Sequence, residues 1–314
     1  MKFQIAALAK LSLSVGLIWY SISRVDLGDV AVQIPTIAPG WAACTVALVL
    51  TQWILGSLRY QKILSVAGIK LSQRVTFDAI MIGAFFSQTL ASFIGGDAMR
   101  MWRISRAGVP LPVAAYTVVI DRIFGFLGLT ALIALGLPLF LSLVQDSLIR
   151  SALFVLIASV VIACIALSYL PDAPSALVRS RAIRAFVGLG NQWRAQFVNY
   201  GSAFALIVVS TGIQGLNVLT VYTAALSLNV EIDLGACMAL IPPVLFLAML
   251  PISFAGWGIR ESTMVLALGL VGISPLQSVT ISICYGLTVL VTSLPGGIFW
   301  LWDKHTAGKD LRKA

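Results

Sequence analysis

The chain has 314 residues, of which 59% are hydrophobic and only 11% charged, and its formal net charge is +9. A mean hydropathy of +0.98 means more apolar surface than a soluble core can bury, so the bilayer must be the main solvent. These values exclude a soluble globular protein. The basic residues lie in short connections between apolar stretches, which indicates membrane topology and argues against a nucleic-acid partner.

Apolar stretches follow one another along the chain, with lengths scattered around the roughly 20 residues that a spanning helix needs. They lie near 5–22, 41–58, 76–94, 111–143, 148–170, 201–228, 235–255, 262–272 and 276–302. The first stretch continues into Arg24 without a small-residue cleavage site, so we expect a retained helix and not a signal peptide. The sequence predicts an all-α polytopic membrane protein with a single domain over residues 1–314.

Charge assigns the connections to the two sides of the membrane. Lys and Arg concentrate at 59–74, 100–106, 179–194 and in the tail, which the positive-inside rule places in the cytoplasm together with both termini. The acidic residues Asp146, Glu231 and Asp233 suit the opposite side. Because 76–94 has basic residues at both ends, it must enter the membrane and return, and 235–272 must do so from the other side. We therefore expect six spanning helices and two opposed re-entrant hairpins.

The same count divides the chain into two related parts. Residues 1–170 form a first half with a hairpin near 76–107, and 201–314 form a second half with a hairpin near 235–272. Opposed hairpins are typical of an inverted repeat with the substrate site between them. Between the halves, 171–200 is expected to be a cytoplasmic interfacial segment. Apolar residues at three- and four-residue steps, such as Phe186, Leu189, Trp193 and Phe197, predict an interfacial helix there, with a solvated loop as the alternative.

Two short charge clusters lie among glycines. They are Gly95-Gly96-Asp97-Ala98-Met99-Arg100 and Gly256-Trp257-Gly258-Ile259-Arg260-Glu261. Ionisable groups at membrane depth are costly, so they indicate a functional site. Gly95, Gly96, Gly256 and Gly258 are the expected positions at which helices break inside the membrane and expose a terminus to a polar ligand.

The first cluster offers two interpretations. Asp97 either caps the helix that it starts, or pairs with an arginine and leaves backbone N–H groups free to bind a phosphate. Arg100, Arg103 and Arg106 recur at steps of three and either reach the interface or present guanidinium groups to a phosphodiester. Arg59, after the second apolar stretch, is either an interfacial anchor or a gate of the same cavity.

Two pairs of neighbours carry opposite charges. Asp121 and Arg122 lie about ten residues into the 111–143 helix, near mid-membrane at roughly 1.5 Å per residue. Neighbours point about 100° apart on a helix and satisfy each other poorly, and the same holds for Arg260 and Glu261. The hypothesis is a network between the halves, in which Asp121 or Asp97 meets Arg260 while Glu261 meets Arg122 or Arg100. The alternative is a structural ion cluster that fixes helix packing.

The candidate substrate-binding residues are those charged groups, and no catalytic residue is predicted. They are Arg59, Asp97, Arg100, Arg103, Asp121, Arg122, Arg260 and Glu261. Cys44, Cys164, Cys237 and Cys284 stand singly at no metal-ligand spacing, and the single histidine, His305, lies in the polar tail. No metal or cofactor is therefore expected.

Ordered motifs give the chain a family resemblance. They are the Gly95–Arg100 cluster, Asp121-Arg122 followed by Gly125 and Gly128, the run from Pro251 to Glu261, and Leu294-Pro295-Gly296-Gly297. Here the chain resembles the flippase-type membrane region of bacterial lysylphosphatidylglycerol synthases and their stand-alone relatives. The resemblance implies an inner-membrane protein that moves a phospholipid or a polyprenyl-phosphate-linked lipid between leaflets. Full-length synthases add an aminoacyl-transferase domain after this region, whereas this sequence stops at Ala314, so lysine transfer is not implied.

Three functions remain open from the sequence. The first is a lipid translocase that holds the headgroup in the charged cavity; without a P-loop motif, transport would be downhill, ion-coupled or driven by a partner. The second is a membrane-embedded glycosyl or lipid transferase that uses Asp26 and Asp29. The third is a non-catalytic membrane subunit of a lipid or glycan synthase. The expected partners are accordingly the lipid, such a synthase and further copies of the chain.

Overall fold

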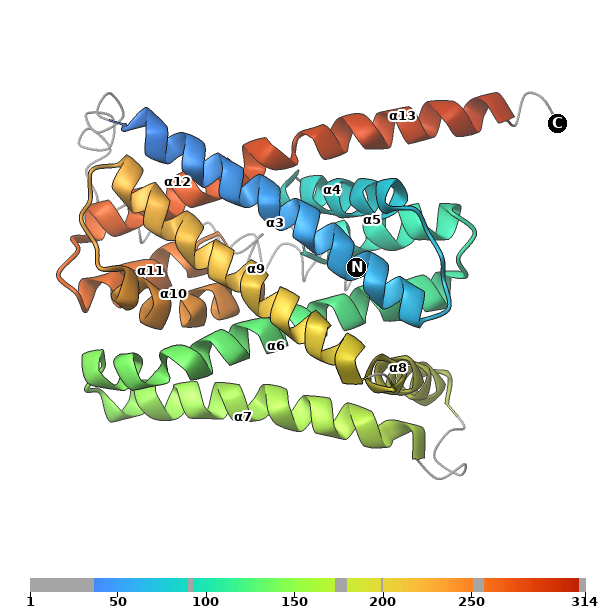
Figure 1. Cartoon of the computed structure of the whole chain (residues 1–314), viewed down its shortest axis with the longest axis horizontal. Helices are drawn as coiled ribbons and strands as arrows, with labels where there is room; N and C mark the ends of the chain where they lie inside the picture. Colours follow the sequence, from blue (N-terminus) through green and yellow to red (C-terminus); the bar gives the residue numbers. More distant parts are fainter. Residues whose placement is uncertain (1–36, 90–92, 173–179, 199, 251–256, 311–314) are drawn as a thin grey trace, which may run out of the picture.

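The computed structural model describes residues 37–89, 93–172, 180–198, 200–250 and 257–310 (Figure 1). The elements in these ranges are all helices. Four are long and apolar enough to span a bilayer: α3 (Pro39–Val66), α6 (Leu111–Leu143), α7 (Ser147–Tyr169) and α9 (Tyr200–Ser227). A fifth candidate span, Pro275–Trp302, consists of α12 (Pro275–Ser293) and the beginning of α13 (Pro295–Asp310). The all-α, multi-pass class expected from composition is confirmed.

These five candidate spans coincide with five of the six spanning segments expected from the sequence. The remaining one, near 5–22, lies outside the described residues.

Pro138 lies inside α6, and Pro242 and Pro243 lie inside α10 (Leu234–Met249), so none of these prolines ends its helix.

Four shorter helices occupy the two predicted hairpin regions. α4 (Gln73–Thr89) packs against α5 (Phe93–Arg106), and α10 (Leu234–Met249) packs against α11 (Ile259–Gly269). In Figure 1 the α4–α5 pair lies toward one end of the bundle and the α10–α11 pair toward the other. The residues that join each pair, 90–92 and 251–256, lie outside the described part of the chain.

A polar stripe joins α3 to α9, which runs antiparallel beside it in Figure 1. Thr45 contacts Thr223 at 2.9 Å between hydroxyls, Gln52 donates to Thr220 at 2.8 Å, and Arg59 donates to Ser210 at 3.2 Å. The three α3 residues are spaced by seven and so share one face of the helix. In a bilayer, where apolar contact does not distinguish protein from lipid, such polar contacts help to fix one helix on another. They set the position of Arg59.

Glycines on α6 let two other helices approach its backbone. A Cβ atom at Gly128 would lie 2.6 Å from the Ser210 carbonyl carbon on α9, and one at Gly136 would lie 2.9 Å from the Met238 carbonyl oxygen on α10. Small residues of this kind allow close helix packing in membranes. Leu129, Leu132 and Ile133 lie between these contacts in the largest apolar core cluster. These contacts fix the part of α6 that follows its charged residues.

The segment between the halves forms a helix, α8 (Arg181–Phe197), and not a loop. Figure 1 shows it nearly end-on, so it runs across the direction of the long helices. Trp193 is only 2% exposed, and its indole N–H donates to the Ser168 hydroxyl at 2.9 Å. Its ring also lies 5.6 Å from that of Phe124 on α6. The apolar face of α8 is therefore partly covered by α6 and α7, which contact Trp193, while Phe186 stays exposed.

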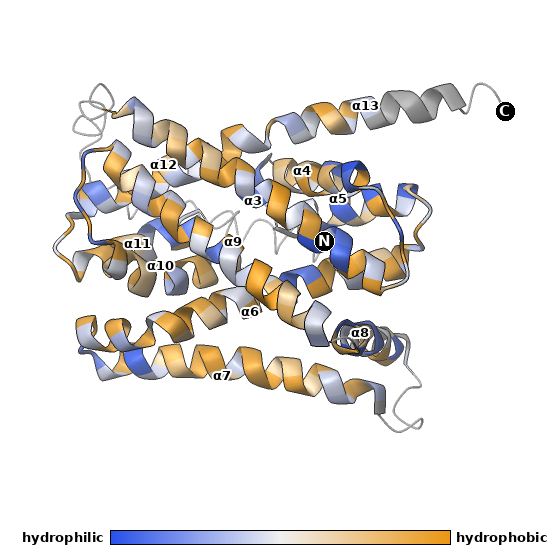
Figure 2. Cartoon of the chain, viewed as in Figure 1, coloured by the Kyte–Doolittle hydropathy of each residue, from blue (hydrophilic) through white to orange (hydrophobic). Residues whose placement is uncertain are grey.

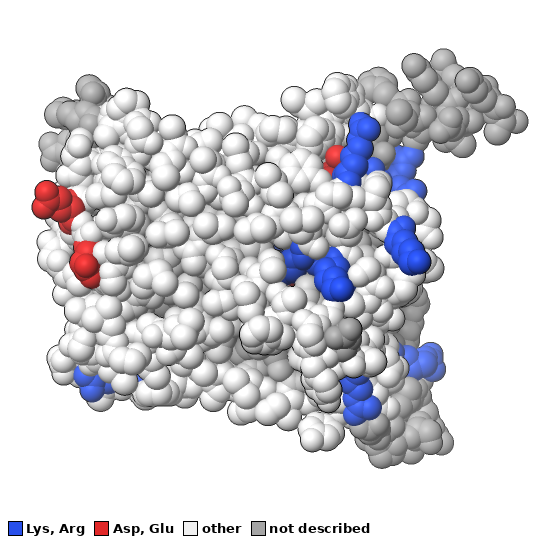
Figure 3. All heavy atoms as spheres, viewed as in Figure 1, with Lys and Arg blue, Asp and Glu red and all other residues white. Residues whose placement is uncertain are grey.

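The bundle is polarised. On the face in Figure 3, Lys and Arg gather mainly toward the end that holds α4, α5 and α8, while Asp and Glu are seen mostly at the opposite end. Figure 2 shows apolar residues along most of α6 and α7, and the exposed side chains of α7 include Phe154, Val155 and Ile162. Such an apolar middle between charged ends suits a membrane-embedded bundle.

Close packing of α13 on α4 can be tested by a single added methyl group. A Cβ at Gly296 would fall on the carbonyl oxygen of Met81, which is backbone and cannot move aside. We expect Gly296→Ala to lower the free energy of unfolding by roughly 1–3 kcal/mol, measured by thermal unfolding of the purified protein in detergent. The control is Gly212→Ala in α9, where nothing lies within 4 Å. Equal stability of the two variants would contradict this packing.

Candidate functional site

A cavity of about 270 Å³ lies inside the bundle, between both short-helix pairs and α3, α6, α9 and α12. Six of the eight predicted binding residues line it: Arg59, Asp97, Arg100, Asp121, Arg122 and Arg260. Gln52, Trp53 and Gly56 on α3 and Gln214 and Asn217 on α9 complete much of the wall. The cavity therefore unites residues as far apart in the sequence as Arg59 and Arg260.

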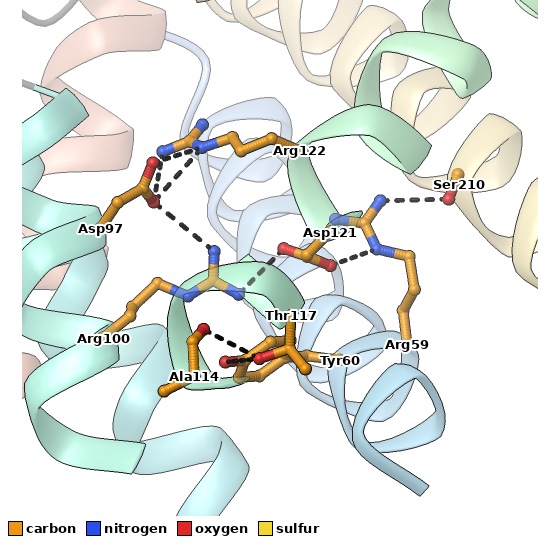
Figure 4. Close-up of polar contacts among 9 residues, drawn as sticks. All are labelled: Arg59, Tyr60, Asp97, Arg100, Ala114, Thr117, Asp121, Arg122 and Ser210. Atoms are coloured by element: carbon orange, nitrogen blue, oxygen red, sulfur yellow. Dashed lines mark hydrogen bonds and ion pairs between the residues drawn. The ribbon is translucent and has the colours of Figure 1, made fainter. Parts of the chain in front are cut away.

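Asp121 holds two arginines (Figure 4). Its Oδ1 accepts from Nε of Arg59 and its Oδ2 accepts from Nη2 of Arg100, both at 2.9 Å. The Asp121 side chain is only 4% exposed and that of Arg100 only 8%. One carboxylate on α6 thus bridges α3 and α5. Charges this deeply buried require such pairing, because an unpaired one costs several kcal/mol.

Asp97 and Arg122 form a second ion pair beside the first. Nε of Arg122 lies 2.9 Å from Oδ2 of Asp97, and its Nη2 lies 3.0 Å from Oδ1. Arg100 stands between both carboxylates, with Nη1 3.7 Å from Oδ1 of Asp97 and its guanidinium carbon 4.4 Å above the Tyr60 ring. Figure 4 shows this chain of alternating charges from α5 across α6 to α3.

Two glycines on the α4–α5 pair make room for Arg100. A Cβ at Gly83 would collide with the Cγ of Arg100, and a Cβ at Gly96 would collide with the Ser87 hydroxyl and the Gly83 carbonyl oxygen. Any larger residue would displace α5 or the arginine. These glycines therefore place Arg100 within reach of Asp121.

Arg260 and Glu261 form a separate unit at the start of α11. Gly258, with a φ of 87°, is the N-cap, and Glu261 Oε2 accepts from its backbone N–H. Arg260 Nη2 lies 2.7 Å from Glu261 Oε1, and its Nε donates to the Ser282 hydroxyl on α12 at 2.9 Å. Trp257 and Tyr285 flank the guanidinium, at 4.6 Å and 5.4 Å from their ring centroids. A Cβ at position 286 would collide with this guanidinium in its present position, so Gly286 leaves space for it.

The predicted network between the halves is wrong in its pairing. Arg260 pairs with its own neighbour Glu261, while Asp97 and Asp121 pair with arginines of the first half. At the start of α11 the Arg260 guanidinium reaches Glu261 and also donates to the Ser282 hydroxyl on α12. The two charged groups nevertheless line the same cavity through Arg122 and Arg260.

The remaining predicted positions fall elsewhere. Arg103 does not line the cavity and lies 3.3 Å from Asp78 on α4. Gly95 and Gly96 lie within the first turn of α5, which begins at Phe93, so Asp97 is inside the helix and not at its N-cap. Gly258 begins α11, as a helix-break position should. Gly256, Asp26 and Asp29 lie outside the described residues.

Sequence reasoning missed the neutral part of the site. Asn217 accepts from the Tyr285 hydroxyl at 2.9 Å and donates to Gln214 at 3.1 Å, and all three line the cavity. Tyr60, Ser210 and Ser282 support the arginines. Polar residues inside the apolar stretch 201–228 were the available signal. In the part of the chain that the structure describes, no group of His, Cys, Asp and Glu is arranged to hold a metal ion.

The fold and the site together define a polytopic helical membrane protein with an ion-paired cavity inside its bundle. The chain belongs to the lysylphosphatidylglycerol synthase TM region family, whose family model matches residues 7–296. The resemblance seen in the sequence motifs is thereby confirmed, and membership makes this a membrane protein related to lipid handling. A comparison with curated proteins gives no match.

The bridging role of Asp121 predicts a large effect on stability. In Asp121→Asn, Arg59 and Arg100 lose their charged partner while remaining buried, so we expect unfolding to become easier by roughly 3 kcal/mol. Thermal unfolding in detergent measures this. The matched control is Glu231→Gln, an exposed residue between α9 and α10, which should change stability by less than about 0.5 kcal/mol. Similar melting temperatures for both variants would refute the bridge.

Proposed function

We propose that the protein is a translocase that moves a phospholipid or a polyprenyl-phosphate-linked lipid between the leaflets of the bacterial inner membrane. The carrying observation is that arginines from both short-helix pairs, Arg100 and Arg260, line one cavity inside a bundle of candidate spans. Such a cavity offers guanidinium groups to a phosphate-bearing headgroup, while the apolar chains stay in the surrounding lipid.

The two short-helix pairs are proposed to be re-entrant hairpins of an inverted repeat. α4 has 17 residues and α10 has 16, which gives lengths near 25 Å, short of a hydrocarbon core of about 30 Å. The second helix of each pair lines the cavity, with Asp97 and Arg100 inside α5 and Arg260 in the first turn of α11. A helix N-terminus at a central site attracts anionic groups, so the start of α11 supports a headgroup site there.

The orientation that we propose puts both termini and the basic connections in the cytoplasm. In a variant without the four native cysteines, a cysteine introduced as Glu231→Cys should react with a membrane-impermeant maleimide added outside intact spheroplasts. A cysteine introduced as Lys70→Cys should react only after permeabilisation; both native residues are exposed and stand at opposite ends of α3 and α9. Reaction of both from outside would overturn this orientation.

Transport itself is tested with purified protein in phosphatidylcholine vesicles that contain traces of a head-labelled phosphatidylglycerol or a labelled polyprenyl phosphate. With protein present, labelled lipid from the inner leaflet should move to the outer leaflet during the assay. There an impermeant reductant can reach the label. Arg260→Gln removes one charged contact to a phosphate, worth about 1.5–3 kcal/mol, so exchange should slow about tenfold or more.

Lys62→Gln is the matched control, because Lys62 is exposed on α3 one turn beyond Arg59 and does not line the cavity. Its exchange rate should equal that of the unmodified protein. If neither labelled lipid exchanges faster than in vesicles without protein, the proposed function is wrong.

A further inference from the structure

The charges around the cavity are unequal in number. Four arginines line it, Arg59, Arg100, Arg122 and Arg260, against two aspartates, Asp97 and Asp121. Glu261, the partner of Arg260, does not line it. The lining residues therefore carry a net charge of plus two, and plus one remains when Glu261, which pairs with Arg260, is counted.

The carboxylate oxygens near the cavity already have donors. Asp121 accepts from Arg59 on one oxygen and from Arg100 on the other, and both oxygens of Asp97 accept from Arg122. Glu261 accepts from Arg260 and Ser282 on Oε1 and from the Gly258 N–H on Oε2. A cationic group entering the cavity would have to share these carboxylates with arginines that already neutralise them, which weakens its attraction.

Among the described residues that line the cavity, one buried guanidinium donor is left without an acceptor. Each arginine carries five N–H groups, more than a shared carboxylate accepts in these geometries. Among the described residues, the buried Nε–H of Arg100 has no acceptor. Arg122 is the most exposed of the paired arginines in the first group, with 28% of its side chain accessible. An oxyanion is the group that supplies acceptors and negative charge at once.

We infer that the cavity selects lipids whose headgroup carries net negative charge, holding the phosphate between Arg122 and Arg260, and disfavours headgroups with an added cationic amine. This inference rests on the proposed translocase function and names its substrate class. Net charge, and not merely the presence of a phosphate, then decides which lipid enters. A zwitterionic headgroup brings its phosphate but also a cation, for which no unpaired carboxylate is at hand in the described wall.

The test compares three head-labelled lipids in the vesicle assay and, separately, their retention on the detergent-purified protein by native mass spectrometry. The probes are phosphatidylglycerol, with one net negative charge, phosphatidylcholine, with none, and lysylphosphatidylglycerol, with one net positive charge. Phosphatidylglycerol should be retained and exchanged about tenfold more than the lysyl ester, with phosphatidylcholine between them.

A variant that changes only the charge of the wall sharpens the test. Gln88 on α4 lines the cavity, and Gln88→Glu adds one negative charge at nearly constant shape. The preference for phosphatidylglycerol should shrink about tenfold in this variant. Lys62→Gln changes the net charge of the protein by the same amount away from the cavity and should leave the preference unchanged.

The outcomes separate the two proposals. Equal exchange of all three lipids, or faster exchange of the lysyl ester, overturns the inference and leaves the translocase intact. Selective retention of phosphatidylglycerol with no exchange of any lipid overturns the translocase and supports the charge selectivity of the cavity. A preference that Gln88→Glu and Lys62→Gln alter alike also overturns the inference, because charge selection would then not come from this wall. If no lipid is retained and none is exchanged, both proposals are overturned.

Discussion

The ion pairs of Asp121 are the constraint on which the arrangement of the first half depends. A carboxylate that is 4% exposed cannot be left without a positive partner, and Asp121 has two, from α3 and from α5. Since both arginines must reach the same side chain, the positions of three helices are set together. The glycines of the α4–α5 pair and the polar stripe between α3 and α9 serve the same geometry, because they bring Arg100 and Arg59 to that point.

The charged group in the second half is built differently. Arg260 and Glu261 neutralise each other within one helical turn, and their other contacts are Gly258 of the same turn and Ser282 of the adjacent α12. Among the described residues of the first half, no carboxylate or arginine pairs with this unit. The α10–α11 pair can therefore change its distance from the Asp121 network without breaking an ion pair, whereas α3, α5 and α6 cannot separate without exposing one. A cavity with one fixed charged wall and one self-contained wall fits the alternating exposure that the proposed translocase function requires.

The same charges give the cavity both its stability and its chemistry. Ion pairs satisfy the carboxylates, and the surplus of guanidinium groups on the wall leaves attraction for an anion. Apolar surfaces such as that of α7 remain available to lipid chains. An amphipathic molecule thus meets a polar interior and an apolar exterior in one protein, which is consistent with membership of a family related to lipid handling.

The sequence by itself determined the membrane class, the order of the helices and most of the charged residues at the site. Apolar length and the cost of burying charge act locally, so five candidate spans and six charged residues that line the cavity could be predicted without coordinates. It also determined the family, through the motifs around Asp97, Asp121 and Arg260. The tertiary structure alone decided which charges pair, because a side chain's partner depends on which helix faces spatially meet. Three ion pairs show this: Arg59 with Asp121, Arg103 with Asp78, and Arg260 with Glu261. They depend on how closely the helices pack and on how far each side chain reaches. The spacing of residues along the chain does not specify either.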